Sequence, residues 1–270
     1  MSLQHERIAS LCDRLLLPFI GEHHLSIIDE AVRDEISLLE FTERLLDAEV
    51  RGRDARSAKT LLKLAGFPAV KTIEDYDFNF SLGVNKQQIM ELATLSFVQA
   101  HKNVIFLGTS GTGKTHLSIA LGVLATQHRM KARFISASDL LIQMQEAKKA
   151  KRYNEYLKRV VMTPSVMVID EIGYFPMNRE DANHFFQVIS RRYEKGATIL
   201  SSNLPFSKWA SIFNDDIVIT TAILDRLLHH SVIVNMQGDS FRLKDKKKEG
   251  FMSLPEVKMK LRNHKKEDDN

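Results

Sequence analysis

The residues best suited to chemistry lie at positions 108–115, where glycines alternate with hydroxyl residues and end in a lysine and a threonine (GTSGTGKT). Glycines at this spacing let backbone N–H groups converge on phosphate oxygens without a Cβ in the way. The lysine ammonium would contact the β- and γ-phosphates of a nucleotide, and the threonine hydroxyl would bind Mg²⁺. The pattern arises by chance in a chain of this length on the order of one time in a hundred. It therefore predicts binding of ATP together with Mg²⁺.

The context of this segment supports the prediction. An apolar strand precedes it, and a helix begins at its lysine, so that the positive end of the helix points at the same anion. Lys114 is expected to act in catalysis and Thr115 as a metal ligand. The expected nucleotide-binding residues are Gly108, Thr109, Ser110, Gly111, Thr112, Gly113, Lys114, Thr115 and His116.

A pair of carboxylates, Asp170 and Glu171, follows the apolar run Val166–Ile169. Ligand sites of parallel sheets lie at the carboxyl ends of the strands, where both residues fall. Asp170 would hold Mg²⁺ through water, and Glu171 would polarise the water that attacks the γ-phosphate. An isolated Asp-Glu pair would more often cap a helix, but the phosphate-binding segment upstream favours the catalytic interpretation.

Asn203 follows the next strand candidate, Thr198–Ser202. An asparagine before Leu-Pro is more often a turn residue when it stands alone. At the end of a strand in an ATPase sheet, its amide is more simply interpreted as the group that orients the attacking water or contacts the γ-phosphate.

Strand-like and helix-like segments alternate from residue 103 onward, which is typical of βαβ units and a mostly parallel sheet. The predicted fold class is α/β with a five-stranded parallel sheet. The predicted strands are Val104–Leu107, Ala132–Ser136, Val166–Ile169, Thr198–Ser202 and Val232–Asn235, and the predicted helices span 114–128, 138–160, 180–195 and 219–230.

The rest of the chain suggests three further regions. Residues 1–68 are predicted to form a small all-helical domain that ends at Gly66 and Pro68, a typical helix stop. Residues 69–84 are acidic and aromatic and are interpreted as a linker, and residues 85–243 form the ATPase domain. Residues 244–270 are expected to form a basic, mobile tail.

The bulk properties favour a cytoplasmic protein that binds no membrane. Cys12 is the single cysteine, and no uninterrupted apolar stretch approaches the roughly 18–20 residues that span a bilayer. The net charge is +4 and the pI about 9.0, with basic residues clustered in three segments. Such clustering is compatible with nucleic-acid binding, although solvated helix faces would look the same.

With these elements in place, the chain resembles an AAA+ P-loop NTPase, and specifically the IstB-like ATP-binding proteins, which assist the transposase of an insertion sequence. The bacterial helicase loaders are related to them. The resemblance covers nearly the whole chain, and the segments that carry it are Leu64–Pro68, Glu91–Phe97, Gly108–Leu117, Val168–Pro176, Ser201–Trp209 and Ala222–Ser231.

The resemblance implies an active site completed between subunits of a homo-oligomer. Arg226 matches the arginine finger that reaches the γ-phosphate of a neighbouring subunit, where a guanidinium can neutralise developing charge. The alternative is a surface ion pair with Asp225 or with a nearby carboxylate. Arg242 resembles the second sensor arginine of the same subunit. The absence of a full C-terminal lid domain fits the transposition-helper and loader branch.

The helical insert between the second and third strands is expected to face double-stranded DNA. It resembles the insertion of initiator and loader ATPases, and its cations would contact phosphates without reading sequence. The alternative is a solvated amphipathic helix. The expected DNA-binding residues are Lys148, Lys149, Lys151, Arg152, Lys158 and Arg159.

A second basic face lies in the N-terminal region and could contact DNA or an acidic surface of the transposase. Its residues are Arg51, Arg53, Arg56, Lys59 and Lys63.

The leading hypothesis is an ATP-dependent DNA-binding regulator that oligomerises on target DNA and recruits or activates a transposase. A loader of a replicative helicase would have the same ATPase residues and a different partner. A nucleotide-bound scaffold without turnover is disfavoured because it does not need Glu171. A GTPase is disfavoured because no N-K-x-D motif is present: Asn85-Lys86 is followed by Gln87-Gln88.

Overall fold

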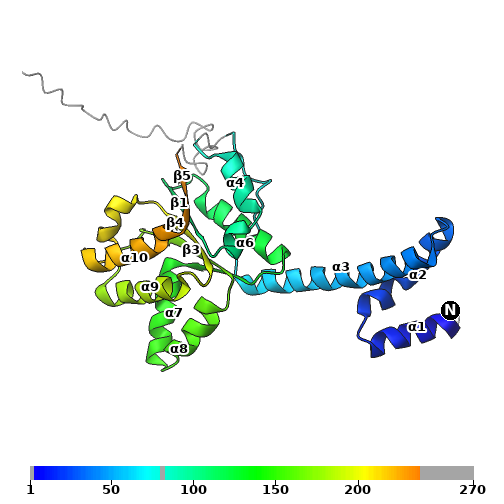
Figure 1. The fold of residues 1–270 in the computed structure, drawn as a ribbon. Coiled ribbons are helices and arrows are strands. Elements are labelled where there is room, and N and C mark those ends of the chain that lie inside the picture. Colours follow the sequence, from blue (N-terminus) through cyan, green and yellow to red (C-terminus); the bar gives the residue numbers. More distant parts are fainter. Residues whose placement is uncertain (1–2, 80–82, 238–270) are drawn as a thin grey trace, which may run out of the picture.

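The computed structural model describes residues 3–79 and 83–237, and its core is one parallel sheet of five strands. The strands lie in the order β2-β3-β4-β1-β5, so that β4 separates β3 from β1 (Figure 1). Every neighbouring pair is parallel, which confirms the predicted α/β fold with its five-stranded parallel sheet. The strands are β1 (Asn103–Gly108), β2 (Ala132–Ser136), β3 (Val166–Ile172), β4 (Ala197–Ser202) and β5 (Ser231–Met236).

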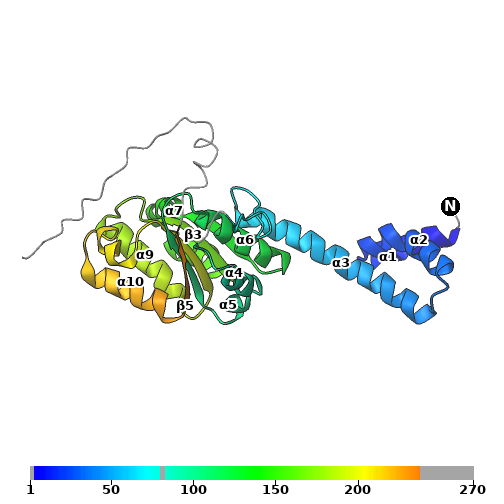
Figure 2. The ribbon, with the colours of Figure 1, turned by 90° about the horizontal axis from the view of Figure 1, so that it is seen from above.

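Alternate strand residues face two separate apolar cores, because successive side chains of a strand point to opposite faces. In β1, Val104 and Phe106 pack on one side, and Ile105 and Leu107 on the other. Helices cover both faces, as the views of Figures 1 and 2 show. One face carries α4 (Lys86–Ala93), α5 (Ser96–Gln99) and α6 (Lys114–Gln127), and the other carries α7 (Ala137–Lys149), α9 (Arg179–Arg192) and α10 (Ile217–His229).

The insert between β2 and β3 is not the single helix over 138–160 that the sequence predicts. Helix α7 ends at Lys149, and the short helix α8 (Tyr153–Tyr156) continues as a π-helical turn, η1 (Leu157–Met162). Lys151 lies between them with a left-handed φ of 56°, a conformation that cannot continue a right-handed helix. Leu157 and Val161 are fully buried in the core, so packing holds the second piece in its new direction.

The N-terminal region forms the helices α1 (Leu3–Arg14), α2 (Pro18–Arg33) and α3 (Leu38–Ala65), which come before α4 in the chain. Ser37 caps α3 by accepting a hydrogen bond from the backbone N–H of Glu40, and Gly66 ends the helix with a φ of 76°, as its position predicts. The last part of α3 packs against α6 and β2, whereas its first part carries α1 and α2 away from the sheet (Figures 1 and 2). None of the helices in the described ranges is long and apolar enough to cross a membrane.

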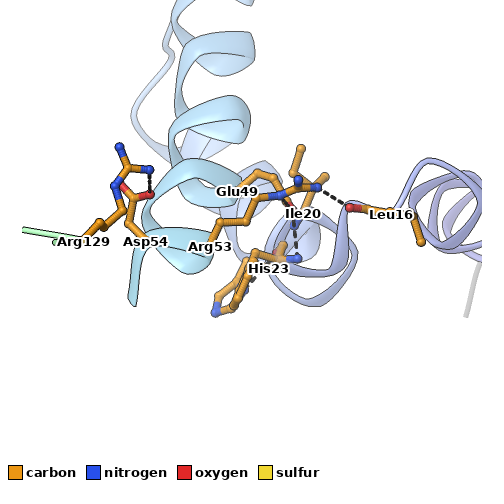
Figure 3. Close-up of polar contacts among 8 residues, drawn as sticks. Leu16, Ile20, His23, Glu49, Arg53, Asp54 and Arg129 are labelled. Atoms are coloured by element: carbon orange, nitrogen blue, oxygen red, sulfur yellow. Dashed lines mark hydrogen bonds and ion pairs between the residues drawn. The ribbon is translucent and has the colours of Figure 1, made fainter. Parts of the chain in front are cut away.

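Glu49 of α3 caps the N-terminus of α2 from across the helix interface (Figure 3). Its Oε2 accepts hydrogen bonds from the backbone N–H groups of Phe19 (2.9 Å) and Ile20 (3.0 Å), which have no partner within the first turn of their own helix. Leu17, at the N-cap position, offers no side-chain acceptor. Arg53 donates to the other carboxylate oxygen at 2.7 Å. The carboxylate is therefore paired on both oxygens, although Glu49 is only 5% exposed.

Replacing Glu49 by glutamine is expected to lower the free energy of unfolding of the helical region by about 1–3 kcal/mol, because charge-assisted hydrogen bonds to buried donors are lost. Burial raises the pKa of Glu49, but Arg53 and the two backbone N–H groups lower it by more, so the pKa lies below its ordinary value. Stability from such a carboxylate is present above its unfolded-state pKa and is lost as pH falls through its folded-state pKa. Thermal unfolding followed by circular dichroism from neutral pH down to about pH 3 measures this effect. The difference in stability between the wild type and the Glu49→Gln variant should become smaller in acid.

The matched control is Glu40→Gln, also on α3, whose carboxylate makes an exposed ion pair with Arg44 at 2.7 Å. Exposed pairs of this kind are screened by solvent and contribute much less than a buried, charge-assisted pair. Equal losses in the two variants would contradict a special role for Glu49.

Candidate functional site

The phosphate loop leaves β1 at Gly108 and enters α6 at Lys114, as predicted. Gly113 has a φ of +92°, and a Cβ added there would stand 2.5 Å from Cε2 of Tyr76, so the close approach of this ring requires glycine. Lys114 is 6% exposed, and its Nζ donates to the backbone oxygens of Gly108 and Thr109, each at 2.7 Å. The ammonium is thereby held over the loop that would receive the phosphates.

Thr115 and Asp170, the two predicted metal ligands, are in direct contact. The Thr115 hydroxyl donates to both carboxylate oxygens of Asp170, at 2.9 and 3.1 Å. Asp170 is 4% exposed and also accepts a hydrogen bond from the hydroxyl of Ser201. Mg²⁺ prefers oxygen ligands of this kind, so the donor set fits a magnesium ion beside the phosphate loop.

A β-bulge in β3 directs Glu171 toward the site. The register between β3 and β4 shifts between Ile169 and Ile172, so that Asp170 and Glu171 together face the single residue Ser201. Glu171 has a left-handed φ of 65°, and its backbone N–H donates to the Ser201 hydroxyl at 2.9 Å. Ser201 therefore holds both carboxylate residues in place. Its role was not predicted from the sequence, although a hydroxyl near the end of the adjacent strand is a usable signal.

A cavity of about 260 Å³ extends from the phosphate loop to the segment 71–77, which the sequence suggested was a linker. The Tyr76 hydroxyl donates to the backbone oxygen of Thr112 at 3.0 Å. The ring of His116 lies edge-on to that of Tyr76 at 5.5 Å, and its Nε2 forms a 2.8 Å hydrogen bond with the Thr72 carbonyl. This segment thus forms one wall of the site. Residues lining the cavity outside the loop include Lys71, Asp75, Tyr76, Asp77, Ile119, Glu171, Tyr174 and Ser201.

Asn203 lies beyond β4 and close to β3. Its Oδ1 is buried, has no hydrogen-bond partner among the described residues, and lies 2.9 Å from where a Cβ on Gly173 would stand. Ser201 lines the cavity, whereas Asn203 does not. The structure thus places the Asn203 amide beside Gly173, two residues after Glu171. The catalytic role of Asn203 stays a prediction.

Arg226 lies outside the ATP cavity of its own chain. On α10, its Nη1 donates to the Ala222 carbonyl at 2.9 Å, and its Cζ lies 4.9 Å from the ring centre of Phe186 on α9. The half-buried guanidinium is therefore held by its own helix and by α9, and not by the phosphate loop. Arg242 lies outside the described residues, as do the tail 244–270 and any lid that would follow β5.

The six basic residues predicted to face DNA are all exposed. Two of them pair with acids: Lys148 with Glu180 at 2.7 Å, and Arg159 with Glu155 at 3.0 Å. Arg152 and Arg159 also line a groove of about 870 Å³ between the insert and the end of α3. The groove contains two further cations that were not predicted from the sequence, Lys131 and Arg133 at the start of β2.

Most basic residues of the N-terminal region make contacts within or between α2 and α3. Arg51 pairs with Asp47 at 2.6 Å, Arg53 binds Glu49, and Cζ of Arg56 lies 5.0 Å from the ring centre of Phe19. Lys59 and Lys63 are exposed. Contacts within and between the helices therefore account for the three arginines, and the binding of DNA or a transposase by this face stays a prediction.

Comparison with known proteins supports the resemblance found in the sequence. The family model described as IstB-like ATP binding protein matches residues 12–249. A protein of Geobacillus stearothermophilus, named as an ATP-binding protein of insertion sequence IS5376, is 44% identical over 90% of this chain and 96% of its own length. A protein of Pseudomonas aeruginosa, named as an ATP-binding protein of insertion sequence IS21, is 42% identical over 90% of this chain and 91% of its own.

Solved structures share the fold of the core. The DnaC helicase loader is 16% identical with a TM-score of 0.51, and the match covers 63% of this chain and 98% of that chain. The initiator DnaA from Aquifex aeolicus bound to an ATP analogue is 22% identical with a TM-score of 0.52, and the match covers 71% of this chain and 59% of that chain. At these identities the likeness shows that this core shares the fold of those proteins and shows nothing further.

Proposed function

This chain belongs to the family of IstB-like ATP binding proteins, and on that premise we propose that it is a regulator of insertion-sequence transposition that assembles on double-stranded DNA. By family and fold the chain is an AAA+ ATPase. The proposal adds that subunits share their ATP sites, and that the assembly on DNA recruits or activates a transposase.

The observation that carries the proposal is the composition of the ATP cavity. Within the described part of the chain, the cavity contains the phosphate loop, Lys114 and Glu171, but no arginine lines it. Phosphoryl transfer in this class of enzyme gains much of its rate from a guanidinium near the γ-phosphate. Arg226 lies on α10 and does not line the ATP cavity of its own chain, and in the proposed assembly it would reach the site of a second subunit. The arrangement supports an assembly in which neighbours complete each other's sites.

Each residue then has a defined task in hydrolysis. Backbone N–H groups of the phosphate loop and the Lys114 ammonium hold the phosphates, and Glu171 takes a proton from the water that attacks the γ-phosphorus. The bond from the γ-phosphorus to the β–γ bridging oxygen breaks, which releases ADP and phosphate. Thr115 and Asp170 would hold Mg²⁺, which when bound neutralises charge on the β- and γ-phosphate oxygens. Arg226 of the neighbour would stabilise the charge on the transferring group.

DNA binding by the insert is testable through its salt dependence. Changing Lys151 and Lys158 to glutamine should weaken binding to unrelated duplexes to a similar extent, because phosphate contacts carry no sequence information. The slope of log affinity against log salt should become less steep by about 0.9 for each lysine that binds a phosphate in the wild type. Fluorescence anisotropy with two unrelated labelled duplexes at several salt concentrations measures both quantities.

The control for this experiment is Lys102→Gln, an exposed lysine between α5 and β1. It should leave both the affinity and the salt slope unchanged. If the double variant also matched the wild type, the insert would be a solvated surface, and the DNA-binding proposal for it would be wrong.

The identity of the protein partner is tested by co-purification. The insertion-sequence names of the relatives favour a transposase, whereas the structural likeness to a helicase loader reflects the shared fold. Capture of the transposase from the same element, in the presence of ATP and DNA, is the expected result. Capture of the replicative helicase in its place would favour the loader alternative.

A further inference from the structure

The ends of α9 and α10 bring three metal-binding side chains together at a place separate from the ATP cavity. Glu194 follows α9, His229 is the last residue of α10, and His230 precedes β5. Each residue offers one possible ligand atom, and these three atoms all lie within 4.8 Å of one another. All three residues are exposed. None of them lines the ATP cavity. The two helices pack side by side on one face of the sheet, which fixes the separation of their ends (Figures 1 and 2).

The contacts around this cluster orient its ligands. The hydroxyl of Tyr193 lies 2.7 Å from Nδ1 of His229, so the Nε2 of that ring is the nitrogen available to a cation. Histidine ligands of metal sites commonly carry such a second contact, which sets the tautomer and the direction of the ring. Nε2 of His230 lies 3.5 Å from a carboxylate oxygen of Glu194. Two ligands bound to one tetrahedral Zn²⁺ at about 2.0–2.1 Å are separated by a similar distance, roughly 3.3 Å.

The donor set selects a class of metal ion. Two imidazoles and one carboxylate suit Zn²⁺ and its neighbours in the first transition series, whereas Mg²⁺ and Ca²⁺ prefer sites made of oxygen alone. Three protein ligands leave room for water, as expected for a site open to solvent. The carboxylate of Glu194 supplies a negative charge directly beside the two imidazoles.

We propose that Glu194, His229 and His230 form a surface site for a single divalent transition-metal ion of the Zn²⁺ class. The ion would join the end of α9 to the end of α10. Its two histidine ligands come three and four residues after Arg226, so the ion would stiffen the helix pair that carries this arginine. The proposal goes beyond the proposed function and does not depend on it.

Titration of the nucleotide-free full chain with Zn²⁺ tests the site by calorimetry. We expect the wild type to bind one ion at this site, and His230→Gln and Glu194→Gln each to lower its affinity by at least about 10-fold. Zn²⁺ should also raise the melting temperature of the wild type in a concentration-dependent manner, and this shift should disappear in both variants. Mg²⁺ should reproduce neither effect. The matched control is His128→Gln, which removes an exposed histidine outside the cluster and should bind like the wild type.

Two further measurements separate a metal site from a simple ion pair. Tyr193→Phe keeps all three ligands but removes the hydroxyl that orients His229, and should weaken Zn²⁺ binding by about 10-fold. Co²⁺ in place of Zn²⁺ should give visible absorption bands of tetrahedral or five-coordinate geometry in the wild type and lose them in His230→Gln. Circular dichroism of each metal-free variant shows whether it is folded. Folded His230→Gln and Glu194→Gln variants that bind Zn²⁺ as tightly as the wild type would overturn the proposal.

Discussion

A Glu171→Gln variant is expected to bind ATP nearly as tightly as the wild type and to hydrolyse it about 10²–10⁴-fold more slowly. Glutamine keeps the size of the side chain but cannot take a proton from the attacking water. The backbone N–H of Glu171 binds Ser201, and this contact does not depend on the carboxylate, so the β-bulge should survive the change. Titration with a fluorescent ATP analogue measures binding, and release of phosphate measures turnover.

The control for Glu171 is Glu91→Gln, which removes an exposed carboxylate on α4, outside the ATP cavity. This variant should hydrolyse ATP at the wild-type rate. Wild-type turnover in Glu171→Gln would remove Glu171 from the role of base. Loss of ATP binding in that variant would indicate that Glu171 has a structural role at the β-bulge. If the wild type itself did not hydrolyse ATP, the alternative of a nucleotide-bound scaffold without turnover would be favoured again.

The phosphate loop and the carboxylate pair could be predicted because each is a short, continuous pattern next to a strand. Thr115 and Asp170 are far apart in the sequence, yet parallel strands end at one edge of a sheet, so the topology alone brings them together. The parallel sheet itself followed from the alternation of apolar segments with helices. Local sequence was therefore sufficient to place the phosphate loop beside Asp170 and Glu171, and phosphate binding by these residues stays a prediction.

The parts that could not be predicted depend on contacts between distant segments. Ser201 matters because a bulge places it opposite two carboxylate residues, and no residue in β3 indicates that bulge. Tyr76 covers the phosphate loop because Gly113 leaves space for its ring. The break in the insert at Lys151 requires a left-handed backbone at a residue other than glycine, for which the sequence carries no marker.

Arg226→Ala is expected to reduce turnover about 10³–10⁵-fold while leaving ATP binding by the phosphate loop intact. In the structure Arg226 contacts Phe186 and its own helix and does not line the ATP cavity, so its loss should leave the phosphate loop of the subunit that carries it intact. Without Arg226, the nearest guanidinium would no longer stabilise the negative charge on the transferring phosphoryl group. The control is Arg191→Ala, which removes an exposed arginine near the end of α9 and should leave turnover unchanged.

Mixing two inactive variants determines whether this arginine acts between subunits. Arg226→Ala retains Glu171, and Glu171→Gln retains Arg226, so a mixed assembly contains sites in which the Glu171 of one subunit meets the Arg226 of the other. In an equal mixture about a quarter of the sites should be intact, and turnover should recover in proportion. Light scattering with ATP and duplex DNA should show multimers under the same conditions. No recovery on mixing, or monomers alone, would contradict the shared site, because a finger that acts within its own subunit cannot be supplied by a neighbour.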